Sequence, residues 1–249
     1  MRKLKKKLKM KTIIHKAENR GFANHGWLQA NHSFSFANFY DPEKVHFGAL
    51  RVLNDDMIAP KMGFGTHPHD NMEIITIPLQ GLLKHRDNMG DEWIPVWPGE
   101  VQVMSAGTGV QHSEINGSET EPLGLFQIWI IPNKQHVKPR YDQKAFDAKE
   151  RKNKLQVLVT SIDENHEGSL KIHQDAIISR IDLDKDTTFQ YKLKSSNHGV
   201  YVMTVSGKVH IHETVLGRRD AIGISDTDSF EIHAEGDASL LFIEVPMRF

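Results

Sequence analysis

The stretches MEIITIPLQGLLKH (residues 72–85) and VYVMTVSGKVHIH (residues 200–212) carry the same pattern, a β-type run, a glycine turn and a second β-type run. A further pair follows in the same order, VWPGEVQVM (residues 96–104) and TVLGRRDAIGI (residues 214–224). Runs of β-branched and aromatic residues between turn signals predict strands, which need a partner sheet to bury their apolar faces. We therefore predict an all-β chain of two tandem antiparallel β-barrels of the jelly-roll type, with one long sandwich as the alternative.

One segment departs from this strand pattern. DQKAFDAKERKN (residues 142–153) is polar and rich in lysine and alanine, which favours a helix. Because it lies between the two copies of the pattern, we predict a linker over residues 136–154 that could be helical. The linker would separate an N-terminal domain over residues 11–135 from a C-terminal domain over residues 155–249.

The composition excludes several kinds of site. The chain of 249 residues has no cysteine, which rules out disulfides, thiolate zinc sites, iron–sulfur clusters and a cysteine nucleophile. Any metal must therefore be held by histidine, carboxylate or water. No apolar run reaches the roughly 18 residues of a membrane span, and the basic start lacks the apolar core of a secretory signal. We expect no membrane partner and a cytoplasmic location.

The charge is unevenly distributed along the chain. Residues 1–10 hold six of the 31 Lys and Arg residues and none of the 32 acids, so the remainder is acidic. Blocks of like charge are usually disordered, and we expect residues 1–10 to form a disordered extension. It could be a solvated tail, a nuclear-import or anionic-surface patch, or an extension ahead of Met10. An acidic body predicts no direct nucleic-acid binding, although the extension leaves room for a protein partner.

Two histidines one residue apart are the first candidates for a metal site. In GTHPHDNMEI (residues 65–74), Pro68 favours an extended backbone at His67, and side chains two positions apart on a strand leave on the same face. Alternate residues lie roughly 6.6 to 6.8 Å apart along a strand, so His67 and His69 could lean toward one ion. Glu73 shares that face if the strand stays regular.

A second cluster, GVQHSEIN (residues 109–116), places His112 and Glu114 on one face as well. Strands joined through Gly81 and Gly99 could bring the two clusters together. Three imidazoles and a carboxylate suit Fe(II), Mn, Ni, Cu or Zn, and they leave open positions for substrate and for dioxygen or water. The alternative is a polar strand face, since the chain holds 15 histidines.

A competing cluster lies in the second half. It contains His210, His212, Glu231 and His233. Aligning the two halves, however, leaves the positions of the first-half candidates without ligands: Leu193 and Ser195 for the first pair, Phe230 and Ile232 for the second. We therefore predict a metal in the first half only and a polar strand face in the second.

Longer motifs link the chain to a known family. HGWLQANHSFSFANFYDP, LRVLNDD, GTHPHDNMEI and LKHRDNMGDEWIPVWPGEVQVMSAGTGVQHSE resemble, in order and spacing, the pirin family of two-domain cupins. The resemblance is strong over residues 21–132 and looser in the second half. The general cupin pattern would make Glu73 a ligand. Pirins take their carboxylate from the second motif, and the resemblance therefore implies His67, His69, His112 and Glu114. Lys61 in place of a leading glycine and an extra residue before Gly81 depart from the general pattern.

The resemblance also implies chemistry. It implies one iron in the N-terminal cupin, a C-terminal cupin that has lost its metal and, as in several members, quercetin 2,3-dioxygenase activity on a small aromatic substrate with dioxygen. Glu114 would be a ligand first and a proton acceptor second. Phe34, Phe36 and Phe64 flank the site and could line an apolar mouth. The alternative, that these three side chains pack in the core of the barrel, is compatible with the sequence to the same degree.

Two other functions are compatible with these residues. One is a metal-dependent, redox-sensing binding protein that acts as a transcriptional or metabolic co-regulator without dioxygenase turnover. The other is a zinc isomerase or hydrolase of a polar substrate. The second predicts polar and cationic walls around the metal, which separates it from an enzyme for a flat aromatic molecule.

Overall fold

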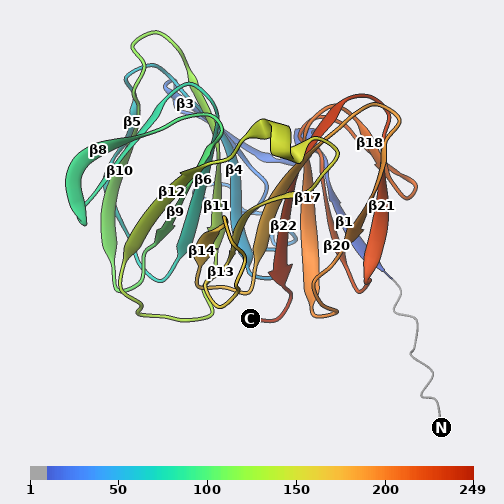
Figure 1. Ribbon diagram of the computed structural model, residues 1–249. Coiled ribbons are helices and arrows are strands. Elements are labelled where there is room, and N and C mark those ends of the chain that lie inside the picture. Colours follow the sequence, from blue (N-terminus) through green and yellow to red (C-terminus); the bar gives the residue numbers. More distant parts are fainter. Residues whose placement is uncertain (1–9) are drawn as a thin grey trace.

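The computed structural model describes residues 10–249, and it is built almost entirely of strands (Figure 1). Its helical elements are two 3₁₀ turns, η1 (Ala17–Asn19) and η2 (Ala148–Arg151). The all-β prediction is confirmed. Most of the basic extension predicted over residues 1–10 lies outside the described residues. Within the described part, no helix has the length and apolarity to cross a membrane.

The first half consists of a seven-stranded sheet and a four-stranded sheet. The seven-stranded sheet has the order β12 (Arg140–Ala145), β9 (Glu100–Ser105), β6 (Glu73–Gln80), β11 (Leu123–Ile130), β4 (Leu50–Ile58), β3 (Leu28–His32) and β2 (Gly21–Asn24). The four-stranded sheet has the order β5 (Gly63–His69), β10 (Val110–Asn116), β7 (Leu83–Asp87) and β8 (Gly90–Val96).

The second half repeats this plan. Its seven-stranded sheet has the order β1 (Lys11–His15), β20 (Ala221–Ser225), β17 (His198–Ser206), β22 (Ala238–Pro246), β15 (Ile177–Leu183), β13 (Gln156–Ser161) and β14 (Leu170–Ile172). Its four-stranded sheet has the order β16 (Thr188–Lys192), β21 (Ser229–Ala234), β18 (Val209–Ile211) and β19 (Thr214–Leu216). Both glycines of the sequence repeat have positive φ, 78° at Gly81 and 83° at Gly207, at corresponding hairpins.

The two large sheets pack against each other through an apolar cluster drawn from both halves. It includes Ile75 and Ile128 from the first half and Tyr201 and Ile243 from the second, and all four are fully buried. The small sheets lie on the outer flanks, with β5, β8 and β10 at one side of Figure 1 and β18 and β21 at the other. Each large sheet therefore turns one face to its partner and the other to the interior of its own half.

Two segments lie across the predicted boundaries. Residues 11–15 form β1, which pairs with β20 in the second half. Residues 140–145, inside the predicted linker, form β12, which pairs with β9 in the first half. The helix predicted for residues 142–153 is wrong. The first part of this segment pairs with the unpaired backbone groups of β9, and the only helical element that follows in the segment is the η2 turn. The division at residues 135 and 155 stays a prediction.

Candidate metal centre

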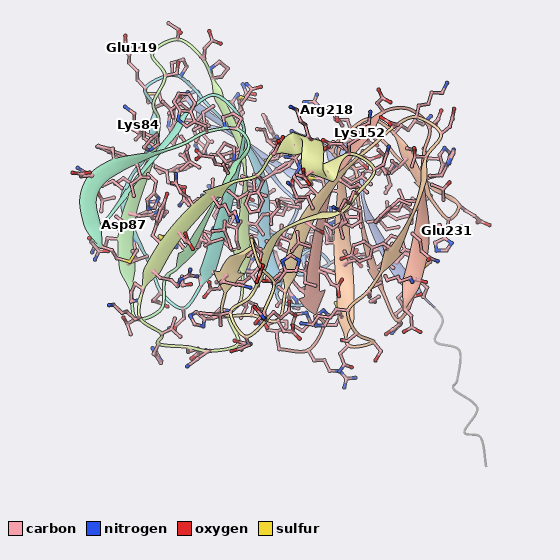
Figure 2. All side chains as sticks on the ribbon, in the orientation of Figure 1. Lys84, Asp87, Glu119, Lys152, Arg218 and Glu231 are labelled. Atoms are coloured by element: carbon pink, nitrogen blue, oxygen red, sulfur yellow. The ribbon has the colours of Figure 1, made fainter. Side chains whose placement is uncertain are left out.

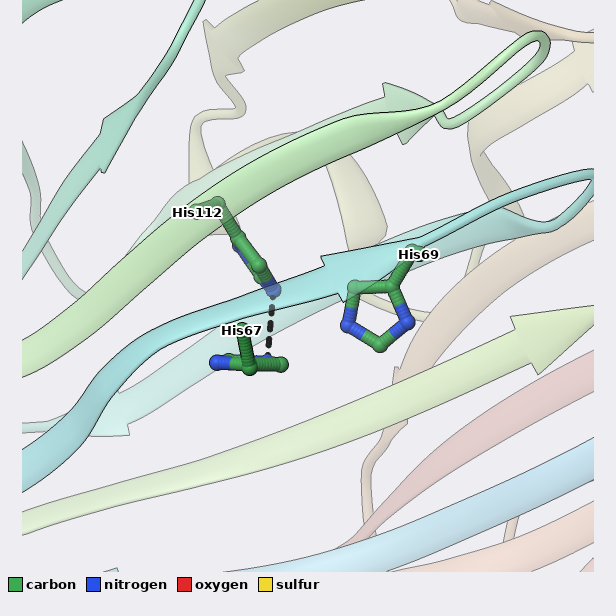
Figure 3. A group of neighbouring side chains, drawn as sticks. All are labelled: His67, His69 and His112. Carbon is green, nitrogen blue, oxygen red and sulfur yellow. Dashed lines mark hydrogen bonds between the residues drawn. The ribbon is translucent and has the colours of Figure 1, made fainter.

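Three of the predicted ligands meet on two neighbouring strands. His67 and His69 lie at the end of β5, and His112 lies on β10 directly opposite His67. Figure 3 shows the three rings converging from these strands. Their ligand atoms all lie within 4.8 Å of one another. Parity along β5, together with the pairing of β5 and β10, thus brings together side chains that are far apart in the sequence.

The arrangement of ring nitrogens fits a metal ion. His67 Nδ1 donates a hydrogen bond to the carbonyl oxygen of Gly65 at 2.8 Å, which leaves the lone pair of its Nε2 free. That atom lies 2.9 Å from Nε2 of His112. Two ligand atoms bound at right angles to one ion at about 2.05 Å are separated by about 2.9 Å. The buried Nδ1 of His112 has no hydrogen-bond partner within the described part of the chain.

Burial keeps two of these imidazoles neutral. Together with the neighbouring histidines, it lowers the pKa of His112 to about 2. It lowers the pKa of His69 to about 4, again with help from His67. A metal binds only deprotonated imidazole, so both rings are ready for coordination at neutral pH without losing a proton.

Glu114 lies beside this group, on the same face of β10 as His112. It is 2% exposed. Its oxygens accept hydrogen bonds from Gln127 Nε2 at 2.8 Å and, more weakly, from Thr76 Oγ1 at 3.4 Å. The carboxylate clusters with His112 and His85, within 4.8 Å, rather than with all three convergent rings.

The orientation of Gln127 is fixed by a tryptophan. Trp129 Nε1, which can only donate, gives a hydrogen bond to Gln127 Oε1 at 3.2 Å. The amide nitrogen of Gln127 must then point the other way, toward Glu114. Trp129 also contacts His69, with ring centroids 4.9 Å apart. One side chain therefore steadies both a histidine and the carboxylate of the site.

His85 supports the site without being free to bind metal. Gln102 Nε2 donates to its Nδ1 at 3.1 Å, so the proton must sit on Nε2, which donates to Asp87 Oδ2 at 2.9 Å. Both nitrogens of this fully buried ring are thus occupied. The His85 ring packs against the His112 ring, with their centroids 5.2 Å apart. His85 is not among the residues predicted from the sequence.

Glu73 lies away from the three histidines. β5 ends at His69, Asn71 turns the chain with φ of 44°, and β6 begins at Glu73, so the regular strand required for a shared face does not exist. The Glu73 carboxylate instead accepts a hydrogen bond from Ser105 Oγ at 2.7 Å. Burial raises the pKa of Glu73 to about 7. No metal-like cluster of the described residues includes it.

A row of polar side chains crosses the inner face of the first large sheet. Strand pairing aligns His32, Asn54, Gln127, Thr76 and Gln102 on five adjacent strands. Thr76 and Gln127 interrupt strands that are otherwise largely apolar, which is the sequence signal that could have revealed the centre of the row. Buried polar groups need partners, and this row supplies them to the histidines and the carboxylate beside it.

A cavity of about 470 Å³ opens in front of the site. His67, His69 and Glu114 line it together with an aromatic wall and several polar groups: Trp27, Phe36, Phe64, Trp129, His32, Asn54, Asp56 and Gln127. Two of the three aromatic candidates from the sequence, Phe36 and Phe64, are in this wall, and Phe34 packs in the core. The volume suits a small molecule, and the flat rings suit an aromatic one.

The second half fills its interior differently. Tyr191 pairs with Phe230 as His67 pairs with His112, so the alignment of Leu193 with His67 is wrong by two residues. These positions hold stacked aromatic rings instead of imidazoles.

The competing second-half cluster is exposed and engaged elsewhere. His210 pairs with Glu235 at 3.1 Å, and His233 contacts Thr188. In the part of the chain that the structure describes, both metal-like clusters belong to the first half.

Replacing Gln127 by methionine should weaken metal binding about 10- to 100-fold, because the amide that orients Glu114 is lost while the volume is kept. The exposed Gln80, replaced in the same way, is the matched control and should change affinity little. Competition with a chelator of known affinity measures both variants. Equal affinities would contradict the orienting role of Gln127.

Asp56 makes the stability of the protein depend on pH. It is 5% exposed, and burial, with Asp55 and Glu114 nearby, raises the pKa of Asp56 to about 8. Between about pH 4 and 8, Asp56 stays protonated in the folded state and is ionised in the unfolded state. The stability that the protonated Asp56 contributes is therefore complete below about pH 4 and is lost as the pH rises to about 8. Against Asp56→Asn, the wild type should lose on the order of 1.4 kcal/mol per pH unit across that window. Urea unfolding of both proteins from pH 5 to 8 measures this, and parallel pH profiles would contradict it.

Comparison with protein families matches both halves of the chain. The family model described as Pirin matches residues 14–130, and the model described as Quercetinase C-terminal cupin domain matches residues 158–245. Over 234 residues the chain is 46% identical to a protein named quercetin 2,3-dioxygenase from Escherichia coli (strain K12), covering 94% of this chain and 98% of that relative. Over 224 residues it is 41% identical to a pirin-like protein from Caulobacter vibrioides, covering 90% and 95%.

A solved structure has the same arrangement. The bacterial pirin YhhW from Escherichia coli, in complex with nickel(II), superposes with a TM-score of 0.88 at 42% identity, covering 95% of this chain and 99% of that chain. The likeness therefore extends over both halves of the chain.

Proposed function

Because the chain belongs to the pirin family of two-domain cupins, we propose that it is a mononuclear metal dioxygenase that opens the central ring of a flavonol such as quercetin. The relative from Escherichia coli (strain K12) is named for this activity, which makes an oxidoreductase the best-supported class for this chain. The single observation that carries the proposal is the convergence of three imidazoles at the edge of an aromatic cavity.

The ligands in this proposal are His67, His69, His112 and Glu114, and the ion is one divalent metal, Fe(II) for the dioxygenase reaction. Such an ion would lower the pKa of a flavonol 3-hydroxyl and offer open positions to substrate and dioxygen. Glu114 lines the same cavity as His67 and His69, so a rotation of its side chain would complete the set. A nickel complex of the pirin from Escherichia coli supports a divalent ion.

The aromatic wall would bind and orient the flat substrate. Trp27 packs edge-on against Phe64, with ring centroids 5.3 Å apart, and Phe36 packs in the same way against Trp129 at 5.3 Å. These two pairs present rigid apolar surfaces that exclude water from the reacting ring. No lysine or arginine of the described chain lines the cavity, which counts against the zinc enzyme for a polar substrate.

Glu114 would act first as a ligand and second as a proton acceptor. Its oxygens already accept hydrogen bonds from Gln127 and Thr76, and a carboxylate that also faces a cation is a weakened base. The proton of the substrate hydroxyl could pass to this carboxylate as the substrate binds. In the net reaction both atoms of dioxygen enter the cleaved product, and one ring carbon leaves as carbon monoxide.

The test is loss of quercetin absorbance by protein loaded anaerobically with Fe(II). We expect rapid loss only when both metal and oxygen are present. Metal-free protein with oxygen, and loaded protein without oxygen, are the controls. If iron binds tightly and quercetin absorbance does not fall, the dioxygenase proposal fails, and a redox-sensing or regulatory role becomes the leading function.

A further inference from the structure

A groove outside the metal centre lies between η2 and the ends of three strands of the second large sheet. Its volume is about 580 Å³, and β15, β17 and β22 contribute to its walls. In Figure 1, η2 is the coiled yellow segment above the seam between the two halves. Neither the metal centre nor the aromatic cavity shares a residue with this groove.

Positive charge is in excess at the groove and behind it, because Arg151 lines the groove and Arg219 lies close enough to act on the charge of Arg180. The side chains of Arg20, Arg151 and Arg219 are only 7%, 15% and 14% exposed. Asp55 forms ion pairs with two of them, with Arg20 at 3.2 Å and with Arg219 at 2.8 Å. Asp182 forms an ion pair with the third, Arg151, at 2.7 Å. Three largely buried guanidinium groups therefore share two carboxylates before the groove's own arginine is counted.

That arginine is Arg180, on β15. Its Nη2 donates to Ser239 Oγ at 3.1 Å, and its buried Nε has no partner in the part of the chain that the structure describes. Burial and the neighbouring Arg151, partly offset by Asp182, lower the pKa of Arg180 to about 10. A buried guanidinium that is poorly paired is costly, because it has lost its water and gained little in return. The site is therefore short of one anion.

Asp182 offers the complementary feature. It lies two residues from Arg180 on β15, so both side chains share a face and both line the groove. Its Oδ2 accepts from Arg151, whereas its Oδ1 is buried and has no partner among the described residues. A buried nitrogen of Arg180 and a buried oxygen of Asp182 therefore lack partners among the described residues, and both side chains reach the groove.

The remaining charges at the rim are already engaged. Lys152 pairs with Asp184 at 3.3 Å, and Asp237 accepts from the backbone nitrogen of Lys185 at 3.0 Å. Lys149 adds a further positive charge to the wall. Figure 2 labels Lys152 and the exposed Arg218 at the end of the molecule where η2 lies. Four of the side chains that line the groove are cationic and three are acidic, so the lining carries one positive charge in excess.

We propose that this groove binds inorganic phosphate, with Arg180 and Ser239 as donors and Asp182 as acceptor of the phosphate's own hydroxyl proton. The Ser239 hydroxyl accepts from Arg180 and is left with a proton to donate. At neutral pH inorganic phosphate keeps at least one hydroxyl, so it can satisfy a donor and an acceptor together. Sulfate has the same shape but no proton, and it would set an oxygen against the Asp182 carboxylate.

Calorimetric titration of the metal-loaded protein at pH 7 tests this, with sodium chloride holding the ionic strength constant. Phosphate should bind saturably and at least tenfold more tightly than sulfate. The same titration on His112→Ala should give an unchanged phosphate affinity, which separates this groove from phosphate bound at the metal. Equal responses to phosphate and sulfate would overturn the proposal, and so would loss of phosphate binding in His112→Ala.

Two variants extend the test. Arg180→Met should weaken phosphate binding at least tenfold, whereas Arg218→Met, which removes an exposed charge nearby, should change it less than twofold. Asp182→Asn should admit sulfate, because an amide can donate where the carboxylate repels. If Arg180→Met binds phosphate like the wild type, the proposal is wrong. If that variant does not fold, the sulfate discrimination of the wild type and of Asp182→Asn decides.

Discussion

His112→Ala should lose metal by about a hundredfold in affinity. The His112 ring is 1% exposed, and it supplies the nitrogen that faces His67 at 2.9 Å. If about 12 kcal/mol of metal binding is divided among four ligands, removing one costs about 3 kcal/mol, or roughly two orders of magnitude in affinity. Metal content after dialysis against a weak chelator, measured by elemental analysis, should fall from near one ion per chain to almost none.

The control for this variant is His210→Ala. His210 lies on β18 of the second half and pairs with the exposed Glu235, so its removal should leave metal content unchanged. Circular dichroism of both variants checks that the strands are intact. Full metal content in folded His112→Ala would contradict the three-histidine metal site.

The second large effect separates two glutamates. Glu114→Gln should lose most of the bound metal, because it removes the negative charge beside the histidines while preserving shape. Glu73→Gln should keep it, because Glu73 hydrogen-bonds to Ser105, away from the three rings. Both residues are almost fully buried, at 2% and 1% exposed, so the pair is matched for burial.

Parallel metal titrations of these two variants measure the difference. Unfolding in urea is recorded alongside, because either change could affect stability. The reverse outcome, with Glu73→Gln losing metal and Glu114→Gln keeping it, would mean that the general cupin pattern applies and that Glu114 only supports the site. Equal loss in both would point to a change in folding rather than in coordination.

Much of the fold could be predicted from local sequence. Alternation of apolar residues and glycine turns identifies strands directly, and the repeat around Gly81 and Gly207 indicates two copies of one plan. The segment over residues 142–153 was predicted wrongly because its helix-favouring composition is a weak local preference. Pairing with the edge strand β9, which no local pattern reveals, decided its conformation.

The site was predictable only in part, for a similar reason. Parity along a strand places His67 with His69 and His112 with Glu114, so those pairs can be read from spacing. Gln127 and His85 could not be found that way, because their contacts depend on register between strands. Parity also failed for Glu73, where a turn at Asn71 interrupts the strand.

The most direct test of the central proposal is the ratio of carbon monoxide released to quercetin consumed. Protein reconstituted anaerobically with Fe(II) is sealed with a known amount of quercetin, oxygen is admitted, and the headspace gas and the remaining flavonol are both quantified. We predict one carbon monoxide for each quercetin, and none with His112→Ala. Quercetin consumed without carbon monoxide, or equal release from the variant, would contradict a metal-dependent ring-opening dioxygenase.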